Sequence, residues 1–192
     1  LSTEKDISVK GLEAIKKCDK IYLESYTSLL QCSVADLEKV YKKKIILADR
    51  EKTEQQFAEI LKEAKTKDVA FLIIGDPFSA TTHTELFKEA KEKKISVKVI
   101  HNASILTAIG ITGLQLYKFG KTTSIPFLDN YDHLETPYNI LRQNMLLEMH
   151  TLFLLDLKPE EKRFMTVNQA LDILENIEQR KKENVIKKGI MV

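Results

Sequence analysis

Short apolar runs alternate with amphipathic stretches along the first part of the chain. Apolar runs of strand length predict β-strands, and apolar residues spaced three and four positions apart predict α-helices. The predicted strands cover residues 21–23, 45–47, 69–74 and 97–100. The predicted helices cover residues 8–17, 33–41, 53–65 and 82–93. Strands that alternate with helices in this way predict an α/β domain with a largely parallel sheet.

Local signals sharpen several of these elements. The run 69–74 is apolar on both faces, which is typical of a central strand in a parallel sheet. Ser8 is a candidate N-cap for the first helix. Ser33 followed by Asp36 forms an acidic variant of the capping box at the start of the second helix. Thr82 is a candidate cap for the helix that begins there.

The pattern changes after Gly120. A strand is predicted over residues 122–125, a helix over 136–147, an apolar run over 151–155 and a last helix over 166–180. These elements predict a second α/β unit. The expected domains are therefore an N-terminal α/β domain, residues 1–119, and a C-terminal α/β domain, residues 120–192.

Both ends of the sequence suggest a truncated catalytic fold. Residues 189–192 read as the start of a strand, and the sequence stops there. At the other end a helix opens by Ser8 with no strand before it, whereas a doubly wound fold normally begins with a strand. We therefore expect the second domain to be incomplete.

Composition excludes several classes of protein. Hydrophobic residues make up 43% and charged residues 30%, an ordinary globular balance. Lys and Arg number 30 against 28 Asp and Glu, a net charge of +2 that is too even for a dedicated nucleic-acid binder. The two cysteines form neither a CxxC nor a Cys/His cluster, which argues against structural zinc and a disulfide scaffold and favours the cytoplasm. No apolar run approaches the roughly 20 residues that span a bilayer, and the N-terminus carries no signal-peptide core.

Polar residues follow three of the apolar runs, where ligands bind in open α/β sheets. Asp76 and Ser79, in the loop after Ile74, offer a carboxylate and a hydroxyl, although a turn with a helix cap explains the loop equally well. Residues 101–105 follow the run 97–100, with an N-cap as the alternative. Asp156 follows Leu155, with a helix or turn cap as the alternative.

The other sequence motifs give little information about function. The chain has no GxGxxG dinucleotide fingerprint and no GxxxxGK[ST] phosphate loop. The GxxG at residues 110–113 is interpreted as a helix-ending turn rather than a nucleic-acid motif. The four histidines lack metal-ligand spacing and are interpreted as structural or surface residues, so no metal site is predicted: His83, His101, His133 and His150.

The loop at residues 75–77 and 80–83 resembles that of the diphthine synthases, in the tetrapyrrole-methylase superfamily. The resemblance continues in order along essentially the whole chain, at residues 6–12, 26–28, 99–105, 110–114, 117–121, 150–152, 154–156 and 165–170. It implies two α/β domains with a cofactor cleft between them. It also implies an S-adenosylmethionine-dependent methyltransferase that acts on the modified histidine of translation elongation factor 2 in diphthamide biosynthesis, with S-adenosylhomocysteine as the product.

The resemblance further implies specific residues and an assembly. Carried over by motif, the cofactor contacts are Leu1, Asp76, Ser79, Ser104, Ile105 and Leu155. The family pattern implies a homodimer with elongation factor 2 as its protein substrate and no nucleic acid or membrane partner. No catalytic residue is assigned, because methyl transfer needs mainly an aligned nucleophile and excluded water. Residues 123–127 resemble the eukaryotic branch, which also forms a methyl ester, more than the archaeal branch, which trimethylates the amine.

Two alternative functions remain open from the sequence. A truncated methylase-like chain could bind elongation factor 2 or a second subunit without transferring methyl groups. A related methylase could act on a tetrapyrrole, although that interpretation does not require the motifs at residues 81–83 and 165–169.

Overall fold

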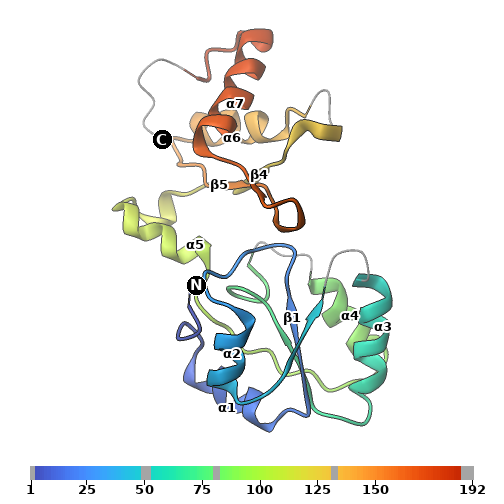
Figure 1. The fold of residues 1–192 in the computed structure, drawn as a ribbon. Coiled ribbons are helices and arrows are strands. Elements are labelled where there is room, and N and C mark those ends of the chain that lie inside the picture. The colour runs from blue at the N-terminus through green and yellow to red at the C-terminus, as the bar shows by residue number, and fades with distance from the viewer. Residues whose placement is uncertain (1–2, 49–52, 80–82, 131–133, 187–192) are drawn as a thin grey trace. The chain divides into compact units, whose positions relative to one another are not determined.

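The computed structural model describes residues 3–48, 53–79, 83–130 and 134–186. The chain divides into two compact units, Leu1–Ile109 and Gly110–Val192, each with its own core (Figure 1). The domain boundary predicted between residues 119 and 120 lies further along the chain and stays a prediction. The cofactor contact at Leu1, the cap at Thr82 and the strand start at 189–192 fall outside the described residues.

Three parallel strands form the sheet of the first unit. Strand β1 (Lys20–Glu24) lies between β2 (Ile45–Ala48) and β3 (Val69–Leu72), with Leu23 opposite Leu47 and Leu72. The predicted parallel sheet is confirmed. The prediction of a central strand at 69–74 is wrong for the described sheet, because β3 lies at one end of the strand order and is half-buried along its length, whereas β1 is almost wholly buried.

The strand predicted at residues 97–100 is also wrong. These residues form no strand, and no ladder joins them to β3 within the described part of the chain. Val97 is 43% exposed, and Lys98 beside it is exposed as well. A run of β-branched residues supplies strand propensity, but a strand forms only where a neighbouring backbone offers hydrogen-bond partners.

The caps of the first two helices follow the sequence. Helix α1 (Val9–Lys17) begins after Ser8, whose hydroxyl accepts a hydrogen bond from the backbone N–H of Gly11 at 3.1 Å. Helix α2 (Val34–Tyr41) begins at a complete capping box of Ser33 and Asp36. Both helices pack on one side of the sheet (Figure 1), where their apolar faces and the sheet bury Ile15, Ile21, Leu23, Leu37 and Tyr41.

Two further helices lie on the other side of the sheet (Figure 1). They are α3 (Thr53–Glu63) and α4 (Thr84–Glu92), and the phenyl ring of Phe57 meets that of Phe71 edge-on at 5.7 Å. The residue at the N-cap of α4 is His83, whose side chain makes no capping hydrogen bond. A short helix, α5 (Ile105–Ala108), ends the first unit.

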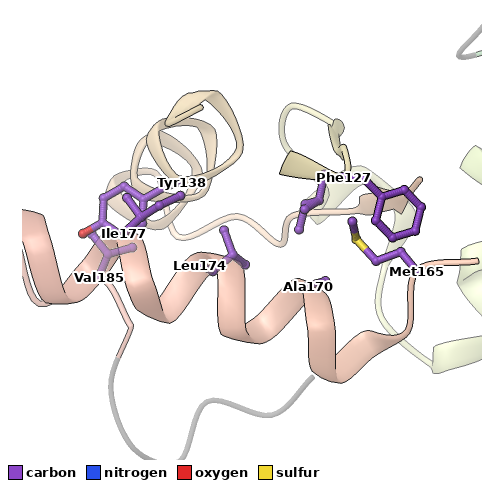
Figure 2. Packing of buried hydrophobic residues seen from close by; sticks show 8 residues of the cluster. Phe127, Tyr138, Met165, Ala170, Leu174, Ile177 and Val185 are labelled. Atoms are coloured by element: carbon purple, nitrogen blue, oxygen red, sulfur yellow. The ribbon is translucent and has the colours of Figure 1, made fainter. Parts of the chain in front are cut away.

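The second unit is built on two short parallel strands and two helices. Strands β4 (Thr123–Ile125) and β5 (Phe153–Leu155) pair in register, and helices α6 (Thr136–Leu146) and α7 (Val167–Lys181) pack with them. Their shared core is shown in Figure 2 and comprises Ile125, Phe127, Tyr138, Met165, Ala170, Leu174, Ile177 and Val185. The predicted elements of this region are therefore confirmed.

Short elements that the sequence pattern did not predict complete this unit. Strands β6 (Leu157–Lys158) and β7 (Arg163–Phe164) form an antiparallel hairpin around a 3₁₀ turn, η4 (Pro159–Glu161). Three more 3₁₀ turns are η1 (Ile109–Thr112), η2 (Leu116–Lys118) and η3 (Leu128–Asn130). Gly113 follows η1 with φ of 82°, so the GxxG segment is a helix-ending turn, as predicted.

Candidate functional site

Asp76 organises the loop that follows β3. Gly75 has a φ of 103°, a left-handed conformation that glycine adopts at no steric cost, and it turns the chain into the loop. One carboxylate oxygen of Asp76, Oδ1, accepts hydrogen bonds from the backbone N–H of Phe78 at 2.9 Å and from the hydroxyl of Ser79 at 3.4 Å. Asp76 therefore holds its own loop in place and is itself buried.

The second carboxylate oxygen of Asp76 holds the other predicted loop. Oδ2 lies 2.8 Å from Nδ1 of His101 and accepts a hydrogen bond from the backbone N–H of Asn102 at 3.2 Å. The side-chain amide of Asn102 then donates to the backbone carbonyl of Asp6 at 2.9 Å. Two segments far apart in sequence thus meet at one buried carboxylate, and Asn102 links them to a third at Asp6. The structure therefore brings together the two loops that the sequence singled out.

The hydrogen bonds to Asp76 decide its charge. Burial by itself raises the pKa of the Asp76 carboxyl, but the hydrogen bonds from Phe78, His101 and Asn102 outweigh it and lower the pKa below the ordinary value of 3.8. Asp76 is therefore ionised at neutral pH. A carboxylate has about four lone-pair positions, and four donors from the described residues occupy them, so the carboxylate is fully engaged within the protein.

A small cavity of about 80 Å³ lies beside this hub, within the first unit. Its walls are mainly apolar and include Leu23, Leu30, Leu72 and Ile74 from the sheet and the segments around it. Its polar lining comes from Thr3, Asp6, Gly75 and Asn102. An apolar pocket with a few polar groups is the usual form of a small-molecule site.

The other predicted site residues are placed as follows. Ser104 is buried, and its hydroxyl accepts a hydrogen bond from the N–H of Leu106 at 3.1 Å, so it caps α5. Ile105 follows with its side chain 43% exposed. Leu155 ends β5 in the second unit, where it packs half-buried against the core. The structure thus joins Asp76 directly to Ser79 and to the loop that leads into Ser104 and Ile105.

The sequence interpretation placed His101 and Asn102 in a candidate loop but gave neither residue a role in the site. It interpreted His101 by itself as a structural or surface histidine and left an N-cap as the alternative for the loop. The available signal was their position immediately after an apolar run, at the same edge as Asp76. Pairing of a specific histidine with a specific carboxylate depends on the tertiary fold.

A second buried polar cluster lies at the end of β1. Glu24 is fully buried, and its carboxylate accepts hydrogen bonds from the N–H groups of Tyr26 and Thr27 and from the hydroxyl of Thr27. The side chain of His83 is buried. The centroid of its ring lies 5.6 Å from that of Phe71 and 6.3 Å from that of Tyr26. Among the described residues, neither ring nitrogen of His83 has a hydrogen-bond partner.

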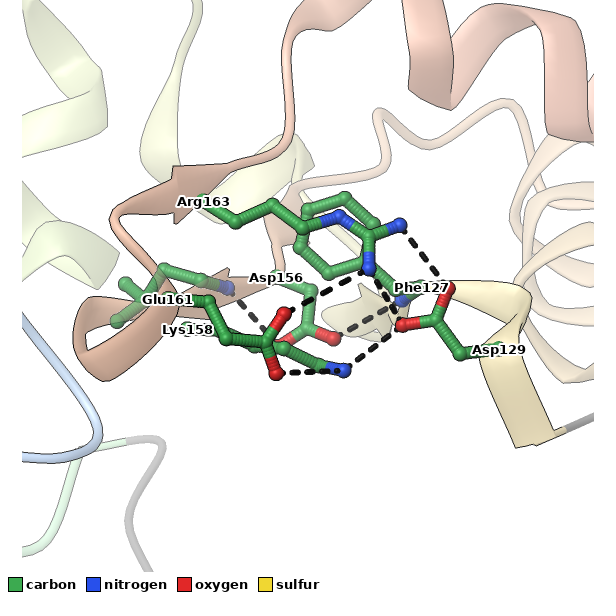
Figure 3. A network of polar contacts seen from close by, with 7 residues as sticks. Phe127, Asp129, Asp156, Lys158, Glu161 and Arg163 are labelled. Atoms are coloured by element: carbon green, nitrogen blue, oxygen red, sulfur yellow. Dashed lines mark hydrogen bonds and ion pairs between the residues drawn. The ribbon is translucent and has the colours of Figure 1, made fainter.

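Asp156, the third acidic residue after an apolar run, has a structural role. Its carboxylate accepts hydrogen bonds from the N–H groups of Phe127 and Leu157, each at 2.9 Å (Figure 3). Beside it, Arg163 binds Asp129 through two nitrogens and stacks on the ring of Phe127 at 3.9 Å. These contacts, with an ion pair from Lys158, lower the pKa of Asp129 to about 2. The polar network fastens the 157–164 hairpin to the core.

Two further observations concern the described residues only. No group of three or more His, Cys, Asp or Glu side chains there is arranged to hold a metal ion. No helix there is both long enough and apolar enough to cross a membrane.

Comparison with known proteins identifies the family. Residues 1–186 match the family described as Tetrapyrrole (Corrin/Porphyrin) Methylases. The diphthine methyl ester synthase of Dictyostelium discoideum is 50% identical, over 96% of this chain and 74% of its own length. The diphthine synthase of Methanococcus maripaludis strain S2 is 49% identical, over 97% of this chain and 73% of its own length. The chain belongs to the diphthine synthase family of methylases.

Solved structures agree with this assignment. A crystal structure of a diphthine synthase is 38% identical, with a TM-score of 0.83 over 95% of this chain and 69% of its own length. The crystal structure of a protein from Entamoeba histolytica is 45% identical in sequence, with a TM-score of 0.86 over 97% of this chain and 72% of its own length. The predicted tetrapyrrole-methylase fold and methyltransferase class are thus confirmed. The names of the relatives favour a diphthine synthase over a tetrapyrrole methylase or a non-catalytic binding protein.

Proposed function

We propose that this chain transfers methyl groups from S-adenosylmethionine to the aminocarboxypropyl-modified histidine of translation elongation factor 2, in diphthamide biosynthesis. The observation that carries the proposal is the identity of about half of all residues, over nearly the whole chain, to proteins named diphthine synthase and diphthine methyl ester synthase. Membership of a methylase family implies S-adenosylmethionine as the methyl donor, which supplies a methyl group bound to a positively charged sulfur.

The first unit fits part of such a cofactor. Whole small-molecule ligands occupy pockets of roughly 300–1,000 Å³, so the cavity of about 80 Å³ matches only one portion of it. The apolar walls suit a nonpolar or aromatic portion, and the amide of Asn102 can provide polar contacts at the lining. We propose that the cofactor also contacts Leu1, Ser79, Ser104, Ile105 and Leu155, as the family motif implies.

Asp76 takes a different part in this proposal from the one its sequence position suggested. Its carboxylate accepts from Phe78 at 2.9 Å and Asn102 at 3.2 Å and bonds His101 at 2.8 Å, with the hydroxyl of Ser79 at 3.4 Å. We propose that Asp76 supports cofactor binding by holding residues 75–79 and 101–102 against each other. The cofactor then meets backbone groups that are already in position, which reduces the entropy lost on binding.

A homodimer in the cytoplasm completes the proposal. Exposed apolar side chains support an interface in the second unit, since Ile111 is 95% exposed and Tyr117 is 74% exposed on neighbouring 3₁₀ turns. Large exposed apolar groups that gather on a surface commonly mark a protein interface. Sedimentation of the wild-type chain beside Ile111→Asp tests this, and a monomeric wild type would contradict it.

The test of the function is a transfer assay with labelled methyl groups. Elongation factor 2 that carries the aminocarboxypropyl group is incubated with the chain and S-adenosylmethionine, and unmodified factor serves as the control. Label on the modified factor alone is the expected result, and mass spectrometry of the peptide distinguishes a trimethylated amine from a methyl ester. Saturable binding of S-adenosylhomocysteine without any transfer would favour a non-catalytic binding protein.

A further inference from the structure

The pair formed by Asp76 and His101 has the form of a proton-accepting dyad. Nδ1 of His101 lies 2.8 Å from Oδ2 of Asp76, a normal distance for a strong hydrogen bond. Because the Asp76 carboxylate is ionised, it can only accept, and the proton of this bond must therefore be on Nδ1. In the neutral ring, Nε2 then carries the lone pair.

The imidazole is also held in one orientation and open to the outside. Phe78 packs edge-on against the ring at 6.3 Å, and the carboxylate fixes its Nδ1 side. The side chain is nevertheless 69% exposed, and within the described part of the chain no hydrogen bond to Nε2 is present. The ionisable side chain that bonds the ring is Asp76, through Nδ1. A base oriented by a buried carboxylate, with its other nitrogen free, is the arrangement that general-base catalysis requires.

We propose that Nε2 of His101 accepts the proton that the substrate amine must lose before it is methylated, with Asp76 as the residue that positions His101. This inference rests on the proposed function. At neutral pH an alkyl amine is an ammonium ion without a lone pair and cannot act as a nucleophile. In the proposed step one N–H bond of the ammonium breaks, its electron pair stays on nitrogen, and the proton forms a bond to Nε2.

The environment of His101 favours this transfer and its reversal. The imidazolium formed is stabilised by the Asp76 carboxylate 2.8 Å from Nδ1. The exposed ring can then release the proton to water, which restores the neutral base. Each methylation produces a new ammonium ion with one fewer N–H bond, so the same cycle serves the next methylation. A carboxylate substrate oxygen needs no such base, so the dyad serves methylation of the amine.

The first test concerns the chain alone. Nitrogen-15 NMR of the histidine ring is expected to show His101 protonated on Nδ1 near neutral pH. In Asp76→Asn, which lacks the charge, the preference for the Nδ1–H form should fall. A wild-type ring protonated on Nε2 instead would overturn the dyad, whether or not the chain has activity.

The second test compares His101→Gln and His101→Ala with the wild type in single-turnover transfer across a pH series. We expect both variants to transfer methyl groups about 100-fold more slowly than the wild type at pH 7. The difference between the variant and wild-type rates should become smaller at high pH, because the amine there loses its proton without a base. Added imidazole should partly restore transfer by His101→Ala, and titration of S-adenosylhomocysteine into each variant measures any loss of cofactor binding separately. His150→Gln, which removes a histidine of the second unit, is the matched control and should retain wild-type rates.

Failure of this inference is distinct from failure of the proposed function. An inactive wild type with an intact fold contradicts the function itself. An active wild type matched by His101→Gln at every pH shows that water is sufficient and overturns the inference. A loss that is equal at all pH values and is not rescued by imidazole would show a purely structural role and would overturn it as well.

Discussion

The backbone N–H of Asn102 donates to the carboxylate of Asp76 at 3.2 Å, and the same asparagine reaches the carbonyl of Asp6 with its side chain at 2.9 Å. The carboxylate and this asparagine thus join three separate segments around the small cavity. A carboxylate at the centre of such a network affects both the stability of the fold and the shape of the ligand site. The two effects can be separated by experiment.

Replacement of Asp76 by alanine should lower both stability and cofactor affinity. The backbone N–H groups of Phe78 and Asn102 would lose their acceptor, and unsatisfied buried donors cost about 2–3 kcal/mol in the free energy of unfolding. Urea unfolding and titration of S-adenosylhomocysteine measure the two effects. Asp129→Ala, which removes an exposed ion-paired carboxylate of the second unit, is the control and should leave the affinity unchanged. Equal affinities in Asp76→Ala and the wild type would contradict the positioning role.

Asn102→Ala isolates the effect on the site. It removes the side-chain hydrogen bond to the carbonyl of Asp6 but leaves the backbone N–H that donates to Asp76. A neutral hydrogen bond contributes about 0.5–1.5 kcal/mol, so the affinity for S-adenosylhomocysteine should fall roughly 2- to 10-fold. Calorimetric titration checks this, with Gln115→Ala, an exposed amide of the second unit, as the matched variant. If both variants bind like the wild type, the Asp6 link has no part in the site.

Gly120→Ala should destabilise the second unit. A Cβ atom at Gly120 would lie 2.6 Å from Cγ of Asn144 and closer still to its Oδ1. Asn144 cannot move away freely, because it is buried and hydrogen-bonded to both backbone groups of Lys121 and to Thr151. Overpacking of this kind costs about 1–3 kcal/mol, and thermal unfolding should show it.

Gly110→Ala is the matched control for that substitution. Its added Cβ would meet Leu116 at 3.4 Å, an ordinary contact with a flexible side chain. We expect a much smaller change in melting temperature than for Gly120→Ala. Equal melting temperatures for the two variants would show that the Asn144 contact gives way without cost.

His83 should make stability depend on pH. Burial lowers the pKa of the His83 imidazole below its ordinary value of 6.5, although the nearby Glu24 carboxylate acts in the opposite direction. The unfolded chain therefore takes up a proton at higher pH than the folded chain does. Stability from this residue is complete above pH 6.5 and is lost as the pH falls below it, through the lowered folded pKa.

Melting temperatures of the wild type and His83→Phe between pH 5 and pH 8 measure this effect. The phenyl ring has a similar shape and cannot take up a proton, so the variant should lose less stability on acidification. His150→Gln, at a histidine of the second unit, controls for the removal of a titratable ring. Parallel curves for the wild type and His83→Phe would show that His83 takes up its proton equally in both states.

The sequence by itself determined the elements whose signals are local. The hydroxyl of Ser8 and the pair of Ser33 and Asp36 lie within one helical turn of the groups that they cap, so short-range spacing predicted both helix starts. Ordered motifs over the whole chain also determined the family, because those residues preserve a shared fold and chemistry.

Only the tertiary structure decided which segments meet. The run at 97–100 has the composition of a strand, yet it pairs with no strand among the described residues, because pairing requires a neighbouring backbone that local propensity cannot supply. The position of β1 at the centre of the sheet was settled in the same way. So was the contact between Asp76 and His101, 25 positions apart, which no periodicity in the chain encodes. A histidine that resembles a surface residue in sequence becomes a candidate base through the carboxylate that the fold places beside it.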